Sequence, residues 1–275
     1  TLEIQNTAPV TESLSLSHIE AKTTDSITVE FTLSDIDGDE ESDSEITRWK
    51  NDVQESSLTG QTTLPSESTV KVEIWTVIVK AGDGTDTSSS SLSANVTILN
   101  SAPTASLSLS SNVTALGPLN LVITTDDVDG DDVETEIMWY RNGFLEGSLT
   151  GELSVPTPLL GPGQTWAVHV IPTDNASTSG ATVIESLLIL NIKPVASIEV
   201  QTEVIWIGES TTLSASLSSD RDGQIVSAAW TWADAEGNVG SASGFEIQII
   251  TLSDTIATLT VIDDMGAIAT ADVQL

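Results

Sequence analysis

Hydrophobic and polar residues alternate along several short stretches of the chain. Residues 27–33 and 119–123 carry an apolar side chain at every second position, as do residues 75–79 and 166–170, each of which begins with a tryptophan. Because successive side chains of a β-strand point to opposite faces, this period of two predicts strands with one buried face. No stretch of the sequence has the longer period of a convincing amphipathic helix.

Turn-forming residues such as Gly, Ser, Asp and Asn separate these stretches and imply about seven strands per 90 residues, a density typical of immunoglobulin-like sandwiches. We therefore predict an all-β chain of tandem immunoglobulin-like antiparallel β-sandwich domains. Aromatic residues make up only 4% of the sequence. Each core is accordingly expected to be aliphatic around one or two tryptophans.

Three strings of the form Asn-x-x-Pro, at Asn6, Asn100 and Asn191, divide the chain into three repeats. The third repeat is the most distant but keeps the frame with the string DRDG from Asp220. We expect one sandwich each in residues 8–101, 102–192 and 193–275. In the first two repeats, later motifs recur at an offset of 91 or 92 residues: DIDGD and DVDGD from Asp35 and Asp127, SLTG from Ser57 and Ser148, and Trp75 and Trp166.

Residues 1–7 precede the first repeat. Their string TLEIQ resembles the strands that end the first two repeats, NVTIL from Asn95 and LLILN from Leu187. We therefore expect an N-terminal strand that resembles the last strand of a preceding domain in a longer array. If Thr1 is instead a mature terminus, the strand has an unpaired edge that can complete a sheet in another subunit and build a filament.

Acidic residues outnumber basic ones 41 to 8, for a formal net charge of −33. Such a surface repels nucleic-acid phosphates and anionic lipid headgroups, so we expect no nucleic-acid partner and regard cations as the natural partners. The same charge is also typical of proteins that stay soluble in a salty habitat. The chain contains no cysteine and no apolar run long enough to enter a bilayer, so neither thiolate chemistry nor direct membrane insertion is expected.

An Asp-x-Asp-Gly string occurs in every repeat. Alternate aspartates on a turn bent by glycine can direct their oxygens at one hard cation, and calcium accepts six to eight such oxygens. Aspartate and glycine are also simply good turn formers, and that reading stays open. Because the string is only half of an EF-hand loop, further ligands must come from elsewhere, with the linker asparagine and the aspartate ending the tryptophan-bearing strand as candidates. The candidate metal ligands are Asn6, Asp35, Asp37, Asp39 and Asp83 in the first repeat, Asn100, Asp127, Asp129, Asp131 and Asp174 in the second, and Asn191, Asp220, Asp222 and Asp263 in the third.

The third repeat resembles polycystic-kidney-disease (PKD) repeats in two stretches, SSDRDGQIVSAAWTW from Ser218 and TLTVIDDMGAIAT from Thr258. The first two repeats are similar to immunoglobulin-like or cadherin-like repeats of microbial surface proteins. The family's Trp-Asp-Phe-Gly-Asp-Gly motif is degraded to WADAEG at residues 232–237, which removes one possible ligand. For the third repeat, the resemblance implies a structural calcium site made by Asn191, by Asp220 or Asp222, and by Asp263. Equivalent positions would serve the other two repeats.

The sequence offers few residues that could carry out catalysis. The two histidines, His18 and His169, belong to different repeats, and no cysteine can partner them. Small sandwiches in series offer no obvious cleft for a pair of catalytic carboxylates. We therefore expect no enzyme. Trp75 and Trp166 follow the apolar phase and are predicted core residues, whereas Trp49, Trp139 and Trp206 are less certain and leave a sugar-stacking role open.

These observations favour an extracellular structural protein in which calcium stiffens tandem repeats into a surface stalk or the subunit of a filament or surface layer. Its partners would be further copies of itself or neighbouring repeats of a longer chain. Abundant Ser and Thr and three possible glycosylation sequons, at Asn95, Asn112 and Asn175, suggest the extracellular or cell-surface location. The alternative is an adhesin or a module of a secreted protein that binds glycan or a surface protein, which would present an exposed aromatic platform.

Overall fold

The computed structural model describes residues 5–202 and 205–275. In this part of the chain the regular structure consists of twenty-two β-strands and four 3-10 helices of three residues each. No helix of the described residues has the length and apolar character needed to cross a bilayer. Residues 1–4, which make up most of the expected N-terminal strand, lie outside the described residues, and residues 5–9 form no strand.

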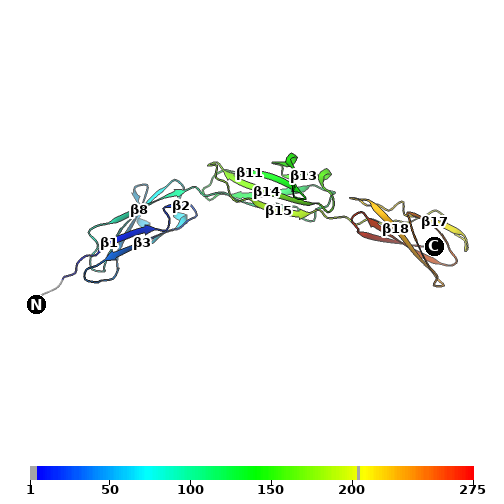
Figure 1. Ribbon diagram of the computed structural model, residues 1–275, viewed down its shortest axis with the longest axis horizontal. Helices are drawn as coiled ribbons and strands as arrows, with labels where there is room; N and C mark the ends of the chain where they lie inside the picture. Colours follow the sequence, from blue (N-terminus) through cyan, green and yellow to red (C-terminus); the bar gives the residue numbers. More distant parts are fainter. Residues whose placement is uncertain (1–4, 203–204) are drawn as a thin grey trace. The chain divides into compact units, whose positions relative to one another are not determined.

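The second repeat is a sandwich of two sheets with the strand orders β13-β10-β9 and β12-β11-β14-β15 (Figure 1). Two 3-10 helices, η3 (Gly147–Leu149) and η4 (Thr157–Leu159), flank β13 along the chain. The strands are β9 (Thr104–Leu109), β10 (Leu119–Asp126), β11 (Val133–Arg141), β12 (Phe144–Leu145), β13 (Ser154–Val155), β14 (Thr165–Asp174) and β15 (Val183–Leu188).

The third repeat has the same two-sheet plan, with the orders β16-β17-β20 and β19-β18-β21-β22. The long central strands β18 and β21 pair antiparallel, with a register shift between Ile225 and Ser227. The strands are β16 (Glu199–Val200), β17 (Ser210–Ser214), β18 (Ile225–Asp234), β19 (Val239–Ser243), β20 (Glu246–Ile250), β21 (Thr255–Asp263) and β22 (Ile268–Gln274).

The first repeat differs by one additional strand, which makes its sheets β1-β3-β6 and β2-β8-β7-β4-β5. The added strand β2 pairs with β8 in parallel, and the pairing ends with Lys22 opposite Leu99. It is an exception to the expected antiparallel pairing. The elements are β1 (Val10–Leu16), β2 (Glu20–Lys22), β3 (Ile27–Ser34), β4 (Glu45–Lys50), β5 (Val53–Gln54), η1 (Ser56–Leu58), β6 (Thr63–Leu64), η2 (Ser66–Ser68), β7 (Ile74–Lys80) and β8 (Leu92–Leu99).

The prediction of an all-β chain of three tandem β-sandwiches is thus confirmed. The expected repeat boundaries lie in the segments between β8 and β9 and between β15 and β16, outside named strands. By compactness the chain divides into two units instead of three. The first unit contains the described residues up to Ala105 together with two segments of the second repeat, Thr125–Thr135 and Ile171–Ala181. These two segments carry the aspartates of the second predicted metal site.

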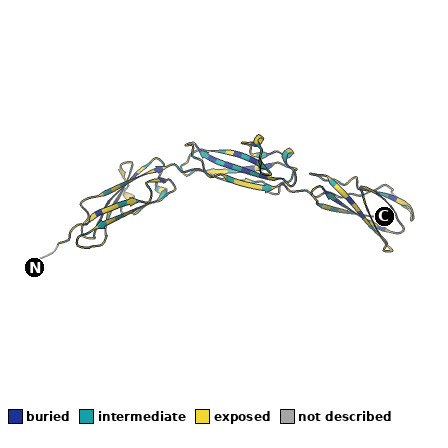
Figure 2. Ribbon diagram, in the orientation of Figure 1, coloured by how far each residue is buried: buried dark blue, intermediate teal, exposed yellow. Residues whose placement is uncertain are grey.

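The alternating pattern becomes alternating burial along the strands (Figure 2). Trp75 and Trp166 are 2% and 0% exposed, which confirms that both belong to the cores. Trp139 is also fully buried, and its indole N–H donates to the backbone carbonyl of Glu152 at 2.9 Å. In the third repeat, Trp230 occupies the corresponding strand and donates to the carbonyl of Gly244 at 2.9 Å. Each of these cores is one continuous apolar cluster.

The first repeat has an arginine where the second has its central tryptophan. Arg48 precedes Trp139 by the repeat offset and is only 2% exposed. Its guanidinium directs one nitrogen at the carbonyl of Gln61, 3.5 Å away, and that carbonyl is the counterpart of the one that Trp139 binds. The Nε of Arg48 has no hydrogen-bond partner among the described residues, and burial lowers its pKa below the ordinary value. The core of this repeat is split into two apolar clusters.

A buried charge without a carboxylate partner is destabilising, so the first repeat should gain stability when this charge is removed. We predict that Arg48→Met raises the free energy of unfolding of the first repeat by about 1 to 4 kcal/mol, the stabilisation seen when apolar residues replace buried ionic groups. Hydrogen exchange of the β4 and β7 amides in the full chain measures this change. Lys50→Met, on the same strand but solvent-accessible, is the control, and faster exchange in Arg48→Met would contradict the prediction.

Candidate metal sites at the start of each repeat

The asparagine at the start of each repeat is hydrogen-bonded to an aspartate more than seventy residues further along the chain. Asp174 and Asp263 are the last residues of β14 and β21, and Asp83 follows shortly after the end of β7. Of these strands, β7 and β14 bear the tryptophans noted in the sequence, and β21 is their counterpart in the third repeat. The sequence indicated only that these two residues recur at matching positions of the repeats. The structure shows that they are in contact. The Nδ2-to-Oδ2 distances are 2.9 Å for Asn6 and Asp83, 2.7 Å for Asn100 and Asp174, and 2.8 Å for Asn191 and Asp263.

The second aspartate of each Asp-x-Asp-Gly string holds the linker backbone. Its carboxylate accepts a hydrogen bond from the N–H of the residue that follows the linker asparagine. One function of this aspartate is therefore to anchor the linker, which uses part of its capacity to bind a cation. The pairs are Thr7 to Asp37 at 2.7 Å, Ser101 to Asp129 at 2.6 Å, and Ile192 to Asp222 at 3.1 Å.

The first aspartate of each string uses its two oxygens differently. In Asp35, Asp127 and Asp220, Oδ1 accepts backbone N–H groups of its own loop, as in the 2.8 Å bond from the N–H of Asp129 to Asp127. The other oxygen, Oδ2, is buried and has no hydrogen-bond partner among the described residues in all three repeats. A buried carboxylate oxygen without a partner is unfavourable, and a bound cation would satisfy it.

The second repeat gathers the most complete set of ligands. Oxygens of Asp127, Asp131 and Asp174 lie within 4.8 Å of one another. The Asp131 side chain is 9% exposed, and its Oδ2 also lacks a partner in the described part of the chain. Carboxylates this close repel one another unless a cation lies between them. This is the one group of three such side chains found in residues 5–202 and 205–275.

The first and third sites are less complete. Asp39, the counterpart of Asp131, is exposed, and the third repeat has Gln224 at this position. In the third repeat, however, the Oδ1 of the linker Asn191 is buried and, like the Oδ2 of Asp220, has no hydrogen-bond partner among the described residues. At the first and third sites, the expected residues thus meet only in pairs. At the second site, three carboxylates form a cluster.

The loop glycines are required for two different reasons. Gly38 and Gly130 have φ angles of +85° and +75°, in the left-handed region that favours glycine. Gly223 is needed for space, because a Cβ there would lie 2.7 Å from Oδ2 of Asp220 and 2.3 Å from Oδ1 of Asp264. In each repeat the glycine therefore lets the loop close around its first aspartate.

The carboxylates of these sites differ in pKa. Burial raises the pKa of Asp174 and Asp263, but hydrogen bonds outweigh it and leave both below the ordinary value. The donors include the linker asparagines and backbone N–H groups such as that of Thr178. For Asp220 the balance is reversed, because burial and the nearby charges of Asp222 and Asp263 raise its pKa.

Two residues of the first repeat contact the second site and were not found by sequence reasoning. The Thr23 hydroxyl is hydrogen-bonded to Oδ1 of Asp129, and the Lys71 ammonium forms an ion pair with Asp131. The same ammonium lies 3.3 Å from Oδ1 of Asn100. Both residues belong to the same compact unit as the second-site loops. Neither stands in a motif, so only the tertiary structure identifies them.

The chemistry of these residues fits a hard divalent cation. The unpartnered oxygens of Asp127 and Asp131, the carboxylate of Asp174 and the amide oxygen of Asn100 would hold calcium in the second repeat, with waters or backbone carbonyls completing six to eight ligands. The ion would offset most of the negative charge of the cluster and join the linker to the body of the repeat.

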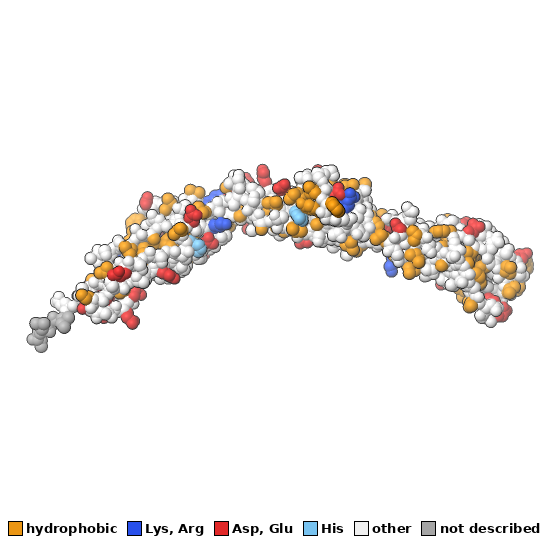
Figure 3. All heavy atoms as spheres, in the orientation of Figure 1, with side chains coloured by type: hydrophobic (Ala, Val, Ile, Leu, Met, Phe, Trp, Pro, Cys, Tyr) orange, Lys and Arg blue, Asp and Glu red, His pale blue; other side chains and the backbone are white. Residues whose placement is uncertain are grey.

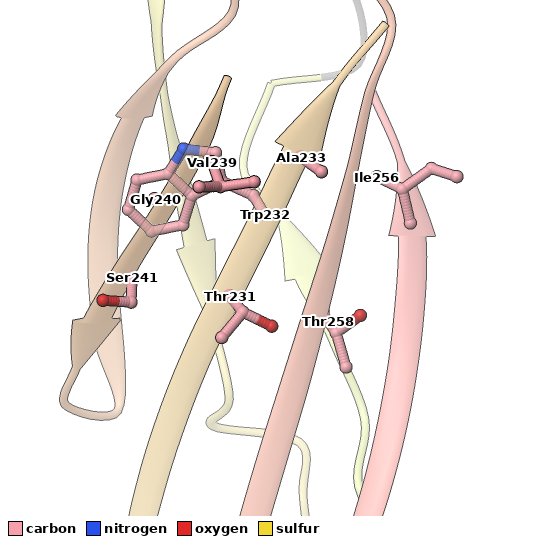
Figure 4. Close-up of a pocket in the computed structure, with 8 residues that line it drawn as sticks. All are labelled: Thr231, Trp232, Ala233, Val239, Gly240, Ser241, Ile256 and Thr258. Carbon is pink, nitrogen blue, oxygen red and sulfur yellow. The ribbon is translucent and has the colours of Figure 1, made fainter. Parts of the chain in front are cut away.

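The remaining tryptophans of the described residues differ in exposure. Trp206 is 70% exposed, Trp49 is half-buried, and Trp139 is too deeply buried to stack on a sugar. In the third repeat, the ring of Trp232 lies over Gly240 of the edge strand β19, where a Cβ would come within 2.3 Å of the ring (Figure 4). Thr231, Ala233 and the side chains opposite them form a shallow groove beside this ring.

The histidines lie in unrelated surroundings. His18 contacts the neighbouring Ser17 hydroxyl at 3.0 Å, and the His169 ring packs on Tyr140 with a centroid distance of 4.4 Å. His169 lies on the outer phase of β14, since Val168 and Val170 on either side are buried. Neither contact has the acid, base and nucleophile arrangement of a catalytic triad.

Comparisons with known proteins give little further information. No protein-family model matches the chain, so the PKD resemblance of the third repeat stays a prediction, and no curated protein sequence is similar to it. A crystal structure of the FN1–FN3 domains of chicken CNTN1 aligns with 97% of this chain and 99% of its own, at 9% identity and a TM-score of 0.28. Similarity this weak supports no inference about function, and the fold assignment rests on the strands described above.

The depressed pKa values of the linker-bound aspartates predict a loss of stability in acid. A carboxylate with a folded-state pKa below its unfolded value stabilises the fold above the unfolded pKa, and this contribution disappears as the pH falls through the folded pKa. In chelator, the unfolding temperature of the wild type should therefore fall as the pH is lowered below 3.8, the ordinary pKa of aspartate. Asp263→Asn should unfold earlier at neutral pH and lose less in acid. Parallel pH profiles of the two proteins would contradict this assignment.

Proposed function

We propose that the chain is an extracellular structural segment whose repeats are stiffened by calcium bound where each linker meets its sandwich. One observation carries the proposal. In all three repeats, the first loop aspartate has a buried oxygen without a partner among the described residues, and an asparagine and a second aspartate already hold the linker. An ion at that position bonds the linker and the sandwich at once and restricts their relative motion.

The charge distribution supports the same function. Acidic side chains are spread over the face shown in Figure 3, whereas the basic ones are few. A surface this negative raises the local concentration of cations. Calcium is abundant outside cells, and extracellular modules bind it with dissociation constants of roughly 0.1 to 1 mM. The three sequons, at Asn95, Asn112 and Asn175, are all exposed, as glycosylation in an extracellular protein requires.

The structural role would be that of a stalk in a surface protein or of a subunit in a filament or surface layer. Sandwiches in series, each with its linker fixed by an ion, hold whatever lies at their ends at a set spacing. Partners would then be neighbouring repeats or further copies of the chain.

Removal of the unpartnered oxygens should abolish the response to calcium. We predict that the triple variant Asp35→Asn, Asp127→Asn and Asp220→Asn loses the calcium-dependent rise in unfolding temperature, while its stability in chelator does not fall. Small-angle X-ray scattering should show that calcium narrows the distribution of particle lengths in the wild type and leaves it unchanged in the variant.

Two control variants separate this effect from other causes. Substitution of Asn for the second aspartates, Asp37, Asp129 and Asp222, should weaken the linkers even in chelator, because these carboxylates hold the linker N–H groups. Glu30→Gln, Glu185→Gln and Glu246→Gln remove the same charge from exposed strand positions and should keep the calcium response. A wild type that is indifferent to calcium in both stability and scattering would overturn the proposed function.

A binding module for glycan or a surface protein is the second candidate, and the 70% exposed Trp206 is the observation that favours it. Under the leading proposal, Trp206→Ala should leave the calcium response unchanged and the wild type should not bind soluble polysaccharides in affinity electrophoresis. Retardation that disappears in Trp206→Ala but persists in Phe144→Ala, which removes an equally exposed ring from the second repeat, would establish the binding module instead.

A further inference from the structure

The second acidic site contains a positive charge that belongs to the first repeat. Lys71 forms an ion pair with Oδ1 of Asp131, and its Nζ lies 3.3 Å from Oδ1 of the linker Asn100. The lysine side chain is 24% exposed and that of Asp131 only 9%, so the contact is largely shielded from solvent. The chain has 8 basic residues against 41 acidic ones. A lysine at this position is therefore a specific feature of the junction.

The segment that carries Lys71 departs from its counterpart in the second repeat. Lys71 and Val72 stand at the positions of Pro162 and Gly163, counted by the repeat offset. Val72 has a φ of +73°, in the left-handed region that a β-branched residue rarely adopts, and Gly163 has +77°. Both residues donate their N–H to the equivalent carbonyl, of Ile98 and Ile189 respectively. The turn thus has the same backbone conformation in both repeats. The first repeat differs in that its turn carries the ammonium group of Lys71.

A second contact from the first repeat supports the same junction. The parallel strand β2 ends beside Leu99, and the next residue, Thr23, is 6% exposed and bonds Asp129. Thr23 and Lys71 therefore reach two different aspartates of one loop. Among the described residues, no lysine or arginine forms an ion pair with the candidate ligands of the first or third site.

We propose that Lys71 is a tethered cation of the second site, which neutralises part of its charge without calcium and lowers its calcium affinity by competing for the same carboxylates. This inference rests on the proposed calcium function. The ammonium pairs with Oδ1 of Asp131, the carboxylate whose unpartnered Oδ2 is a candidate calcium ligand, and it approaches Oδ1 of Asn100, a second candidate ligand. An ion that enters must share these two side chains with the lysine or displace it, and it experiences like-charge repulsion from the nearby ammonium.

The consequence is a junction that does not depend on calcium alone. When calcium is scarce, the lysine and Thr23 still hold the loop of the second repeat. When calcium is plentiful, the ion takes over the buried oxygens of Asp127 and Asp131, and the flexible lysine stem can move toward solvent. The second site would then bind calcium at higher calcium concentrations than the same carboxylates would require without the lysine.

The test is a calcium titration of the full chain by isothermal calorimetry, in a background where Asp35→Asn and Asp220→Asn disable the other two sites. Lys71→Met should bind calcium at least about tenfold more tightly than the same background with Lys71, because a like charge a few ångströms from the ion is removed. Lys71→Arg keeps the charge and should keep the weaker affinity. Lys50→Met removes one charge from the same repeat, away from the candidate ligands, and should change the affinity little.

The outcomes separate this inference from the function on which it rests. Equal or weaker calcium binding by Lys71→Met, or an equal gain in Lys50→Met, would overturn the role of Lys71 while leaving the calcium site intact. Absence of calcium binding in every variant, including the unmodified chain, would overturn the proposed function together with it. A lower unfolding temperature of Lys71→Met in chelator, restored by Asp131→Asn in the same chain, would show independently that the lysine balances the acidic cluster.

Discussion

The hydrogen bond between a linker asparagine and a distant aspartate is the contact on which the rest of each site depends. In the second repeat it joins Asn100 to Asp174 at 2.7 Å, and it fixes the start of the repeat to the end of strand β14. The Asp-x-Asp-Gly loop can then close over the linker, because its second aspartate finds the linker N–H within reach. The first aspartate is left with a buried oxygen that has no hydrogen-bond partner in the part of the chain that the structure describes.

This arrangement concentrates negative charge at one end of every sandwich, and the three repeats deal with that charge differently. The second repeat collects three carboxylates and receives a lysine from the first. The third keeps fewer carboxylates, and its Asp220 has a raised pKa because its charged form is disfavoured by burial and by neighbouring aspartates. A cation would relieve such repulsion, and this is the physical basis of the calcium proposal.

The first repeat combines several unfavourable features that the others lack. Arg48 is buried at the position where the second repeat has Trp139, and Val72 adopts a backbone conformation suited to glycine. The same repeat supplies Thr23 and Lys71 to the neighbouring site. Both features are expected to reduce the stability of this domain, and the domain contributes two side chains to the junction with the second repeat.

The sequence by itself determined the architecture and the pairing frame of linker asparagine and distant aspartate in the candidate sites. A period of two specifies which face of a strand is buried, and motifs that recur at a constant offset must occupy equivalent places in equivalent folds, so the sandwiches, Trp75 and Trp166 and the asparagine–aspartate frame could all be predicted. Only the tertiary structure decided how each oxygen is used, because hydrogen bonds between residues such as Asn191 and Asp263 depend on loop closure over long separations. It also decided the contacts of Lys71 and the burial of Arg48, since a charged residue in isolation carries no signal of the surface it will meet.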